Sequence, residues 1–153
     1  MIVRTAMASL LRAIGVLATA LILASCDEPL RDLAGPSPDL EPTIDSIQRN
    51  IFQLTDEAGR NACVNCHTSV GRVPPMGLDL TADAHAALVN VPSRERPELM
   101  RVKPGDPENS YLIHKMEGRA SIVGSRMPFN GPPYLTEGQI AIVKRWIETG
   151  APR

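Results

Sequence analysis

Residues 63–67 read Cys-Val-Asn-Cys-His, and they constrain the fold more than any other feature of the 153-residue chain. Two cysteines separated by two residues can each form a thioether bond to one of the two vinyl groups of a single haem. The next residue, His67, can then donate an imidazole nitrogen to the iron. The motif therefore predicts one covalently bound haem c, attached at Cys63 and Cys66 and ligated by His67.

The same cysteines also allow other kinds of site. A redox dithiol needs only Cys63 and Cys66. A structural zinc site needs four ligands, and the chain has three cysteines with no second pair. His85 and His114 are available to complete a zinc site, but they lack the spacing of common zinc modules. A disulfide between Cys63 and Cys66 would close a loop too small to stabilise the fold much.

Residues 1–25 predict a secretory signal peptide. They carry Arg4 and Arg12, an apolar run over residues 13–23, and no acidic residue. The apolar run is too short for a membrane span. We therefore expect the mature protein to lie outside the cytoplasmic membrane, where bacteria attach haem to proteins of this kind.

The apolar run ends in Leu-Ala-Ser-Cys, residues 23–26. This sequence resembles the lipobox of bacterial lipoproteins, which implies that Cys26 becomes the acylated amino terminus. Several acyl chains hold a protein firmly on a membrane, so we expect a lipid anchor on the periplasmic side of a bacterial membrane. The alternative is cleavage at another position, which leaves Cys26 as a free or disulfide-bonded thiol.

Residues 26–42 predict the lipidated cysteine followed by a flexible tether. Four prolines and several acids interrupt regular structure and keep this segment solvated. The alternative is that Leu30, Leu33 and Leu40 dock on the domain.

The chain has 16 Lys and Arg, two of them in the signal peptide, against 17 Asp and Glu. The mature protein is therefore mildly acidic without a basic patch, and no nucleic-acid partner is expected.

Residues 43–153 predict an all-α domain, because no segment alternates convincingly enough to form a strand. The first helix is expected to begin after an N-cap at Thr43 and to end near Gly59, with apolar residues at helical spacing. A short helix over residues 82–89 is expected after an N-cap at Thr81. The apolar residues of the first helix are Ile44, Ile47, Ile51 and Leu54.

Two further helices are expected in the second half of the chain. One begins at Asp106-Pro107, with proline in its first turn, and ends at Gly118. The last begins with a capping box formed by Thr136 and Gln139 and ends at Gly150. Its apolar face is made by Ile140, Val143, Trp146 and Ile147. Trp146 is expected to make a structural contact between the terminal helices.

Haem iron in electron carriers is usually held on both faces, with Met or His as the second axial ligand. Met127 is favoured because it lies in an irregular loop, where Pro128 fixes the adjacent backbone and the thioether does not compete with helix packing. Met76 lies so soon after His67 that its loop is expected on the proximal side. The other candidates are Met100, Met116, His85 and His114.

The order of these features resembles class I cytochromes c, and more closely the cytochrome domains of the planctomycete type. The resemblance covers nearly all of residues 44–153. It implies a small helical fold in which the first and last helices cross, with His67 and Met127 as axial ligands and a carbonyl of residues 72–75 accepting from His67. The matching stretches are residues 63–67, 77–80, 103–112, 126–128, 135–139 and 146–152.

The sequence departs from the family pattern at two places. Phe129 stands where a second proline is expected, and residues 91–102 form a longer and more charged segment, which leaves room for a docking surface. Arg72, Arg119 and Arg126 are candidates to bind the haem propionates, although a solvated surface position is the simpler interpretation of each.

These observations together predict a lipid-anchored monohaem c-type cytochrome that carries single electrons between redox partner proteins and is not an enzyme. Three other classes remain open. A haem enzyme or gas sensor would keep the sixth iron position free. A thiol–disulfide oxidoreductase would use Cys63 and Cys66. A structural lipoprotein would hold a small metal site without redox chemistry.

Overall fold

A computed structural model of the protein describes residues 40–56 and 58–153. The predicted signal peptide, Cys26 and residues 27–39 of the predicted tether lie outside the described residues. The four α-helices of the described part are α3 (Ile44–Ile47), α4 (Ala84–Leu88), α5 (Tyr111–Glu117) and α6 (Glu137–Glu148). Backbone pairing between segments there is limited to isolated bridges such as Val89 with Val102. The prediction of a helical fold is therefore confirmed at this coarse level.

The first helix begins as predicted, but it ends earlier. The Thr43 side chain caps α3 by accepting a hydrogen bond from the Ser46 amide at 3.2 Å. A π-helical turn, η1 (Gln48–Phe52), continues α3 and ends the helix at Phe52 instead of near Gly59. The reason is Arg60, whose guanidinium donates to the carbonyls of Ile51 and Leu54 and folds the following segment back. The predicted core residue Leu54 is consequently 46% exposed.

The second helix is capped by a different residue from the one predicted. The Asp83 side chain accepts from the Ala86 amide at 2.9 Å and begins α4 at Ala84. Thr81 lies two residues before the N-cap position, and its amide and hydroxyl both donate to the Asp79 carboxylate.

The helix predicted from Asp106 to Gly118 is divided into two elements. A 3₁₀ turn, η4 (Pro107–Asn109), comes first, and α5 begins only after Ser110, whose backbone is extended. The Ser110 hydroxyl donates to the Asp106 carbonyl at 2.8 Å and stabilises this break. The helix α5 then ends as predicted, with Gly118 in the left-handed region at φ +72°.

The last helix agrees closely with its prediction. Thr136 and Gln139 form the capping box at the start of α6, and Gly150 follows its end with φ +97°. Trp146 is fully buried, and its indole Nε1 donates to the Pro152 carbonyl at 2.8 Å. Trp146 is therefore a core residue, and its predicted contact between the terminal helices stays a prediction.

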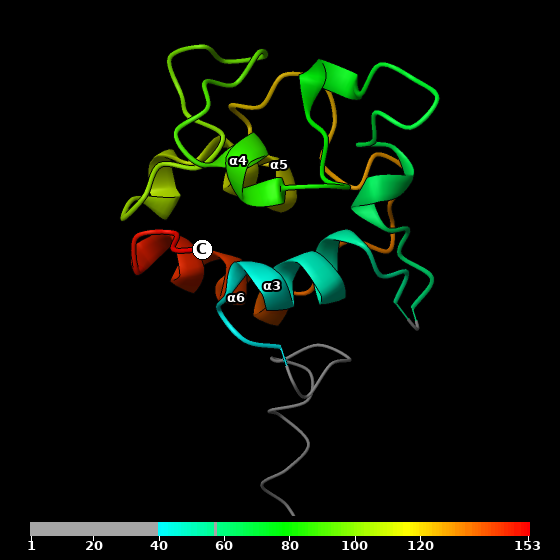
Figure 1. Cartoon of the computed structure of the whole chain (residues 1–153), viewed down its shortest axis with the longest axis horizontal. Coiled ribbons are helices and arrows are strands. Elements are labelled where there is room, and N and C mark those ends of the chain that lie inside the picture. Colours follow the sequence, from blue (N-terminus) through cyan, green and yellow to red (C-terminus); the bar gives the residue numbers. More distant parts are fainter. Residues whose placement is uncertain (1–39, 57) are drawn as a thin grey trace, which may run out of the picture.

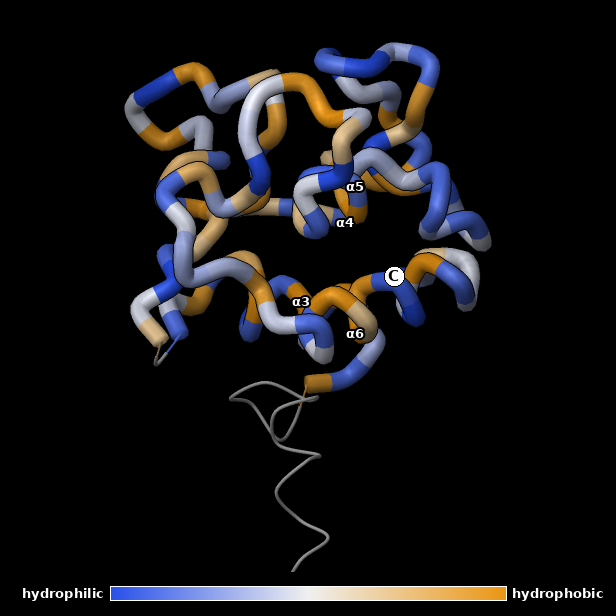
Figure 2. Tube along the Cα trace, turned by 180° about the vertical axis from the view of Figure 1, so that it is seen from behind, coloured by the Kyte–Doolittle hydropathy of each residue, from blue (hydrophilic) through white to orange (hydrophobic). Residues whose placement is uncertain are grey.

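The helices form two layers (Figure 1). One layer contains α3 and α6, which contact each other, and the other contains α4, α5 and long loops, with α5 packed on α6. Viewed from behind, Figure 2 shows apolar stretches along α3, α5 and α6, whereas the loops mix apolar and hydrophilic stretches. Leu40 packs on this core, as the docking alternative expects for that residue. The fully buried core side chains are Ile47, Ile51, Phe52, Leu88, Val102, Ile113, Val143, Trp146 and Ile147.

Candidate functional site

The Cys-Val-Asn-Cys-His motif lies in a tight turn that follows η1. Residues Cys63–Asn65 form a 3₁₀ turn, η2, and the amide of His67 donates to the Cys63 carbonyl at 2.9 Å. Both thiols are free. The Cys63 side chain is half-buried, with Sγ 3.7 Å from the Ile51 carbonyl oxygen, whereas Cys66 is exposed. The turn therefore presents the two cysteines and the histidine from a single compact segment.

Arg60 holds this turn in place, although the sequence analysis did not single it out. The residue is 1% exposed, and its Nε lies 3.0 Å from the Asp56 carboxylate. The remaining guanidinium nitrogens donate to backbone carbonyls, including that of Asn61 at 3.3 Å. A buried charge needs both an ion-pair partner and hydrogen bonds, and this arrangement supplies them within one loop.

The His67 ring has a nitrogen without a partner. Its Nδ1 atom is buried and makes no hydrogen bond to any described residue. The predicted hydrogen bond from His67 to a carbonyl of residues 72–75 is not formed. The backbone group that affects the pKa of the ring is that of Leu78. Burial lowers the pKa of His67 below its ordinary value, and hydrogen bonding toward Leu78 only partly opposes this effect. The ring is therefore neutral near pH 7, which is the form of imidazole that ligates metals.

The His67 ring borders a largely apolar cavity between the two layers. Its volume is about 180 Å³, which is less than the about 300–1,000 Å³ of typical small-molecule and cofactor sites. The cavity brings together Cys63, His67 and Met127. Its apolar walls are formed by Phe52, Pro75, Met76, Leu78, Leu80, Leu88, Leu112, Met116, Pro128 and Leu135.

Met127 reaches the cavity from the loop before α6, as predicted. Its amide donates to the Lys115 carbonyl at 2.9 Å, which fixes the loop against α5. Met116 and Met76 also line the cavity, and the expectation that the Met76 loop lies on the proximal side stays a prediction. Met100 is not part of the lining.

The two other histidines are bonded away from the cavity. The Nε2 atom of His85 lies 3.0 Å from the Ala151 carbonyl oxygen. The Nε2 atom of His114 lies 2.7 Å from the Glu108 carbonyl oxygen, and its Nδ1 lies 3.4 Å from the Ser121 hydroxyl. Neither histidine is brought near the two cysteines, as a zinc site with these ligands would require. No three His, Cys, Asp or Glu side chains gather as a metal site within residues 40–56 and 58–153.

One part of the cavity wall is charged, and the sequence analysis did not assign it to the site. Arg94, Glu95 and Arg101 come from the long segment 91–102, and Lys115 comes from α5. Lys115 Nζ lies 3.0 Å from a Glu95 carboxylate oxygen, and the Tyr111 hydroxyl donates to the same oxygen at 2.9 Å. The unusual charge density of residues 91–102 was the only signal of this wall in the sequence.

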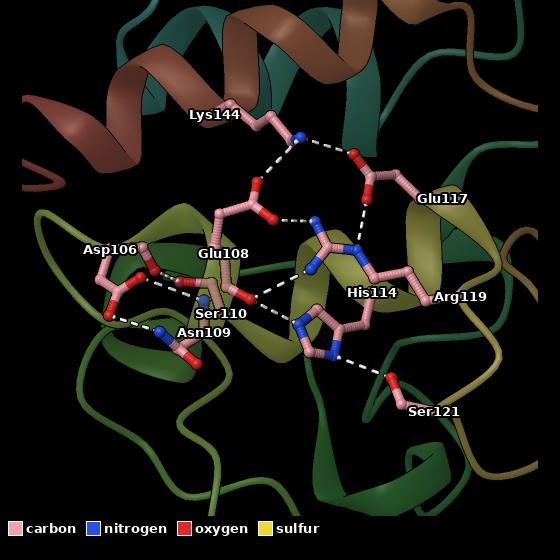
Figure 3. A network of polar contacts seen from close by, with 9 residues as sticks. All are labelled: Asp106, Glu108, Asn109, Ser110, His114, Glu117, Arg119, Ser121 and Lys144. Carbon is pink, nitrogen blue, oxygen red and sulfur yellow. Dashed lines mark hydrogen bonds and ion pairs between the residues drawn. The ribbon is translucent and has the colours of Figure 1, made fainter.

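The arginines proposed from the sequence as propionate partners lie elsewhere. Arg72 is exposed, and Arg126 donates to the Met116 carbonyl and stacks on the Tyr134 ring at 4.2 Å. Arg119 belongs to a surface network outside the cavity (Figure 3). None of these three residues lines the cavity.

The surface network in Figure 3 joins α5 to α6 and is balanced in charge. Two cations, Arg119 and Lys144, each lie between the same two carboxylates, those of Glu108 and Glu117. The four separations are between 2.5 and 3.2 Å. His114 lies at the inner edge of this network.

Comparison with known proteins finds no matching family, no matching characterised protein and no matching solved structure. Among the helices of the described part, none has the length and apolar character needed to cross a membrane.

Proposed function

We propose that the protein is a monohaem c-type cytochrome that carries single electrons. The observation that carries this proposal is that Cys63, His67 and Met127, from distant parts of the chain, line one apolar cavity. Cys63 and Cys66 would attach the haem, and His67 and Met127 would ligate its iron. When bound, the haem supplies an iron that takes up and releases one electron.

The residues present fit this cofactor in three respects. The His67 ring borders the cavity, and burial lowers its pKa, which favours the neutral imidazole that ligates metals. Met127 offers a thioether from a loop whose backbone is anchored on Lys115. The apolar walls exclude water, which limits solvent rearrangement around a group that changes charge.

A thiol–disulfide oxidoreductase is less well supported by the same residues. Such an enzyme needs a thiol whose pKa is lowered toward neutrality. Burial raises the pKa of the Cys63 thiol above its usual range, although the nearby Arg60 opposes this shift. A raised pKa leaves Cys63 protonated and unreactive toward disulfides, whereas it does not disfavour a cysteine whose sulfur is held in a thioether.

We propose that the cytochrome faces the periplasm of a bacterium, held on a membrane by lipidated Cys26 and a tether up to residue 42. In this position it would exchange electrons with redox proteins as a carrier and not as an enzyme.

The anchor is tested by membrane fractionation of the full chain and of Cys26→Ser. We expect the wild type in membranes and the variant in the soluble periplasmic fraction. A fully soluble wild type with an unmodified Cys26 would contradict the anchor.

The function is tested by spectroelectrochemical titration of the full chain, produced in a bacterial host that attaches haem to secreted proteins. We expect one reversible one-electron transition, and no binding of carbon monoxide by the reduced protein, because Met127 occupies the sixth position. Rapid carbon monoxide binding would instead show an open position and would replace electron transfer by a gas-binding or catalytic function.

A further inference from the structure

Two arginines on the cavity wall have no carboxylate partner in the part of the chain that the structure describes. Arg94 and Arg101 both line the cavity. No ion pair joins either of them to any carboxylate of residues 40–56 and 58–153. A buried charge without a charged partner is costly; this applies to Arg101, whereas Arg94 is exposed to solvent at the edge of the cavity.

Arg101 is the more buried of the two, at 8% exposed. Its guanidinium donates to the Ala87 carbonyl at 2.8 Å and to the Met76 carbonyl at 2.7 Å. These neutral acceptors fix the side chain without compensating its charge. Burial, together with repulsion from Arg94, lowers the pKa of Arg101. The two guanidinium groups are therefore close enough to repel each other.

Arg94 is held beside the cavity by the shape of the neighbouring loop. Its guanidinium lies over Gly77, where an added Cβ atom would come within 2.5 Å of the Arg94 Cζ atom. Gly77 also has a φ of +63°, which glycine adopts without strain. A glycine at position 77 thus serves both the turn and the close approach of Arg94.

The remaining charges of the cavity wall compensate each other. Lys115 is paired with Glu95 at 3.0 Å, and Tyr111 donates to the same carboxylate. Glu95, the only acid that the described residues contribute to the wall, is therefore already engaged with a cation. Two uncompensated positive charges remain, those of Arg94 and Arg101.

We propose that Arg94 and Arg101 bind the two carboxylates of the haem at this wall of the cavity. This inference rests on the proposed function. Haem carries two propionates, so its dianion matches the two uncompensated guanidinium groups in number and sign. Hydrogen bonds between guanidinium and carboxylate are charge-assisted and roughly twice as strong as neutral ones. The pair would hold the haem carboxylates ionised inside a mostly apolar site.

The test uses the full chain with its haem attached, in the forms Arg94→Gln, Arg101→Gln and Arg101→Lys. Reduction potential is measured against pH. Reduction adds negative charge, so a haem carboxylate has a higher pKa in the reduced protein than in the oxidised protein. Between these two pKa values the reduction potential falls as pH rises, which gives a sloping region in the profile. Loss of one guanidinium should move this sloping region to higher pH by about one to three units. Arg101→Lys should move it less, because lysine keeps the charge.

Arg72→Gln is the matched control, because it removes the same charge from an exposed position outside the cavity lining. It should leave the sloping region in place. Glu95, Tyr111, Lys115 and His67 also face the cavity and are unchanged in every variant. Arg101→Gln also loses two backbone hydrogen bonds; if it fails to fold, Arg94→Gln still decides the question.

With the haem spectrum intact, either of two results would overturn the assignment of the carboxylates to these arginines. One is an unshifted pH profile in Arg94→Gln, and the other is a shift in Arg72→Gln as large as that in Arg94→Gln. That result is distinct from failure of the proposed function, in which the wild type itself would carry no haem and both proposals would fall.

Discussion

The helix α5 lies between two clusters of charged residues that differ in whether their charges are balanced. On the side toward α6, Arg119 and Lys144 are matched by Glu108 and Glu117 (Figure 3). On the cavity side, the cations exceed the acids by the two guanidinium groups of Arg94 and Arg101. The first cluster is a charge-balanced tie between α5 and α6, whereas the second has an excess of positive charge among the described residues.

The histidines of the two sides show the same difference. Both ring nitrogens of His114 have hydrogen-bond partners, whereas Nδ1 of His67 is buried with no partner in the described part of the chain. Buried polar atoms without partners are rare in proteins and need an explanation. The proposed haem would lie against the His67 ring and would bring carboxylates to Arg94 and Arg101, the second of which also ties two loops through the Ala87 and Met76 carbonyls.

The largest expected contrast is between substitutions of these two histidines. His67→Ala should abolish the spectrum of six-coordinate haem, because it removes the proximal ligand. His114→Ala should keep the spectrum and lower the free energy of unfolding by about 1–3 kcal/mol, because it removes a buried imidazole with its hydrogen bonds to the Glu108 carbonyl and the Ser121 hydroxyl. Absorption spectra and urea unfolding of both variants measure this. A normal spectrum in His67→Ala would show that His67 does not ligate the iron and that the two histidines do not differ in this respect.

The second contrast is among the methionines. Met127→Ala should lose the weak near-infrared band of sulfur-to-iron coordination and should have a lower reduction potential, because a thioether favours ferrous iron. Haem attachment should be unaffected. Met76→Leu and Met116→Leu, whose side chains share the cavity, should keep the band, as should Met100→Leu, which lies outside it. Loss of the band in one of these three, with its retention in Met127→Ala, would move the ligand to that residue.

The third contrast concerns the ion pairs. Glu95→Gln should lower the free energy of unfolding by about 3 kcal/mol, because it leaves the nearly buried Lys115 ammonium without its partner. Glu117→Gln in the more exposed network should cost about 1 kcal/mol or less. Urea unfolding monitored by circular dichroism gives both values. Equal costs would show that burial does not distinguish the two clusters.

The smallest effect concerns Asp79, which closes the loop beside the cavity. Hydrogen bonds from the hydroxyls of Ser69 and Thr81, and from the Thr81 amide, lower its pKa to about 2. Its contribution to stability is therefore present above pH 4 or so, the ordinary range of the Asp pKa, and is lost as pH falls toward 2. Asp79→Asn should flatten the fall in the urea midpoint over this range. An unchanged slope would show that these bonds contribute nothing to the acid sensitivity of the fold.

Local signals in the sequence account for much of the fold. The caps at Thr43 and Thr136, the glycine after α5 and the burial of Ile44, Ile47 and Ile51 follow from spacing and side-chain chemistry alone. The structure places Met127 on the cavity wall, from the proline-flanked loop where the sequence located it, and its role as axial ligand stays a prediction.

Features that depend on contacts between distant segments were missed. The early end of the first helix depends on buried Arg60, whose partners become neighbours only when the loop closes. The charged wall depends on how residues 91–102 lie against α5 and residues 75–77, and that segment has no periodicity from which its placement could be inferred. Local sequence signals therefore located Cys63, His67 and Met127, three residues of the cavity wall, and not the residues that give the wall its charge.

The central claim is that Cys63 and Cys66 carry a haem, and the most direct test is the intact mass of the denatured full chain after acid and organic extraction. We expect the mass of one haem to remain on the polypeptide, mapped to the peptide that contains both cysteines, and to be lost in the Cys63→Ala, Cys66→Ala double variant. Complete extraction of the haem, or a wild-type peptide with two unmodified thiols, would contradict the claim.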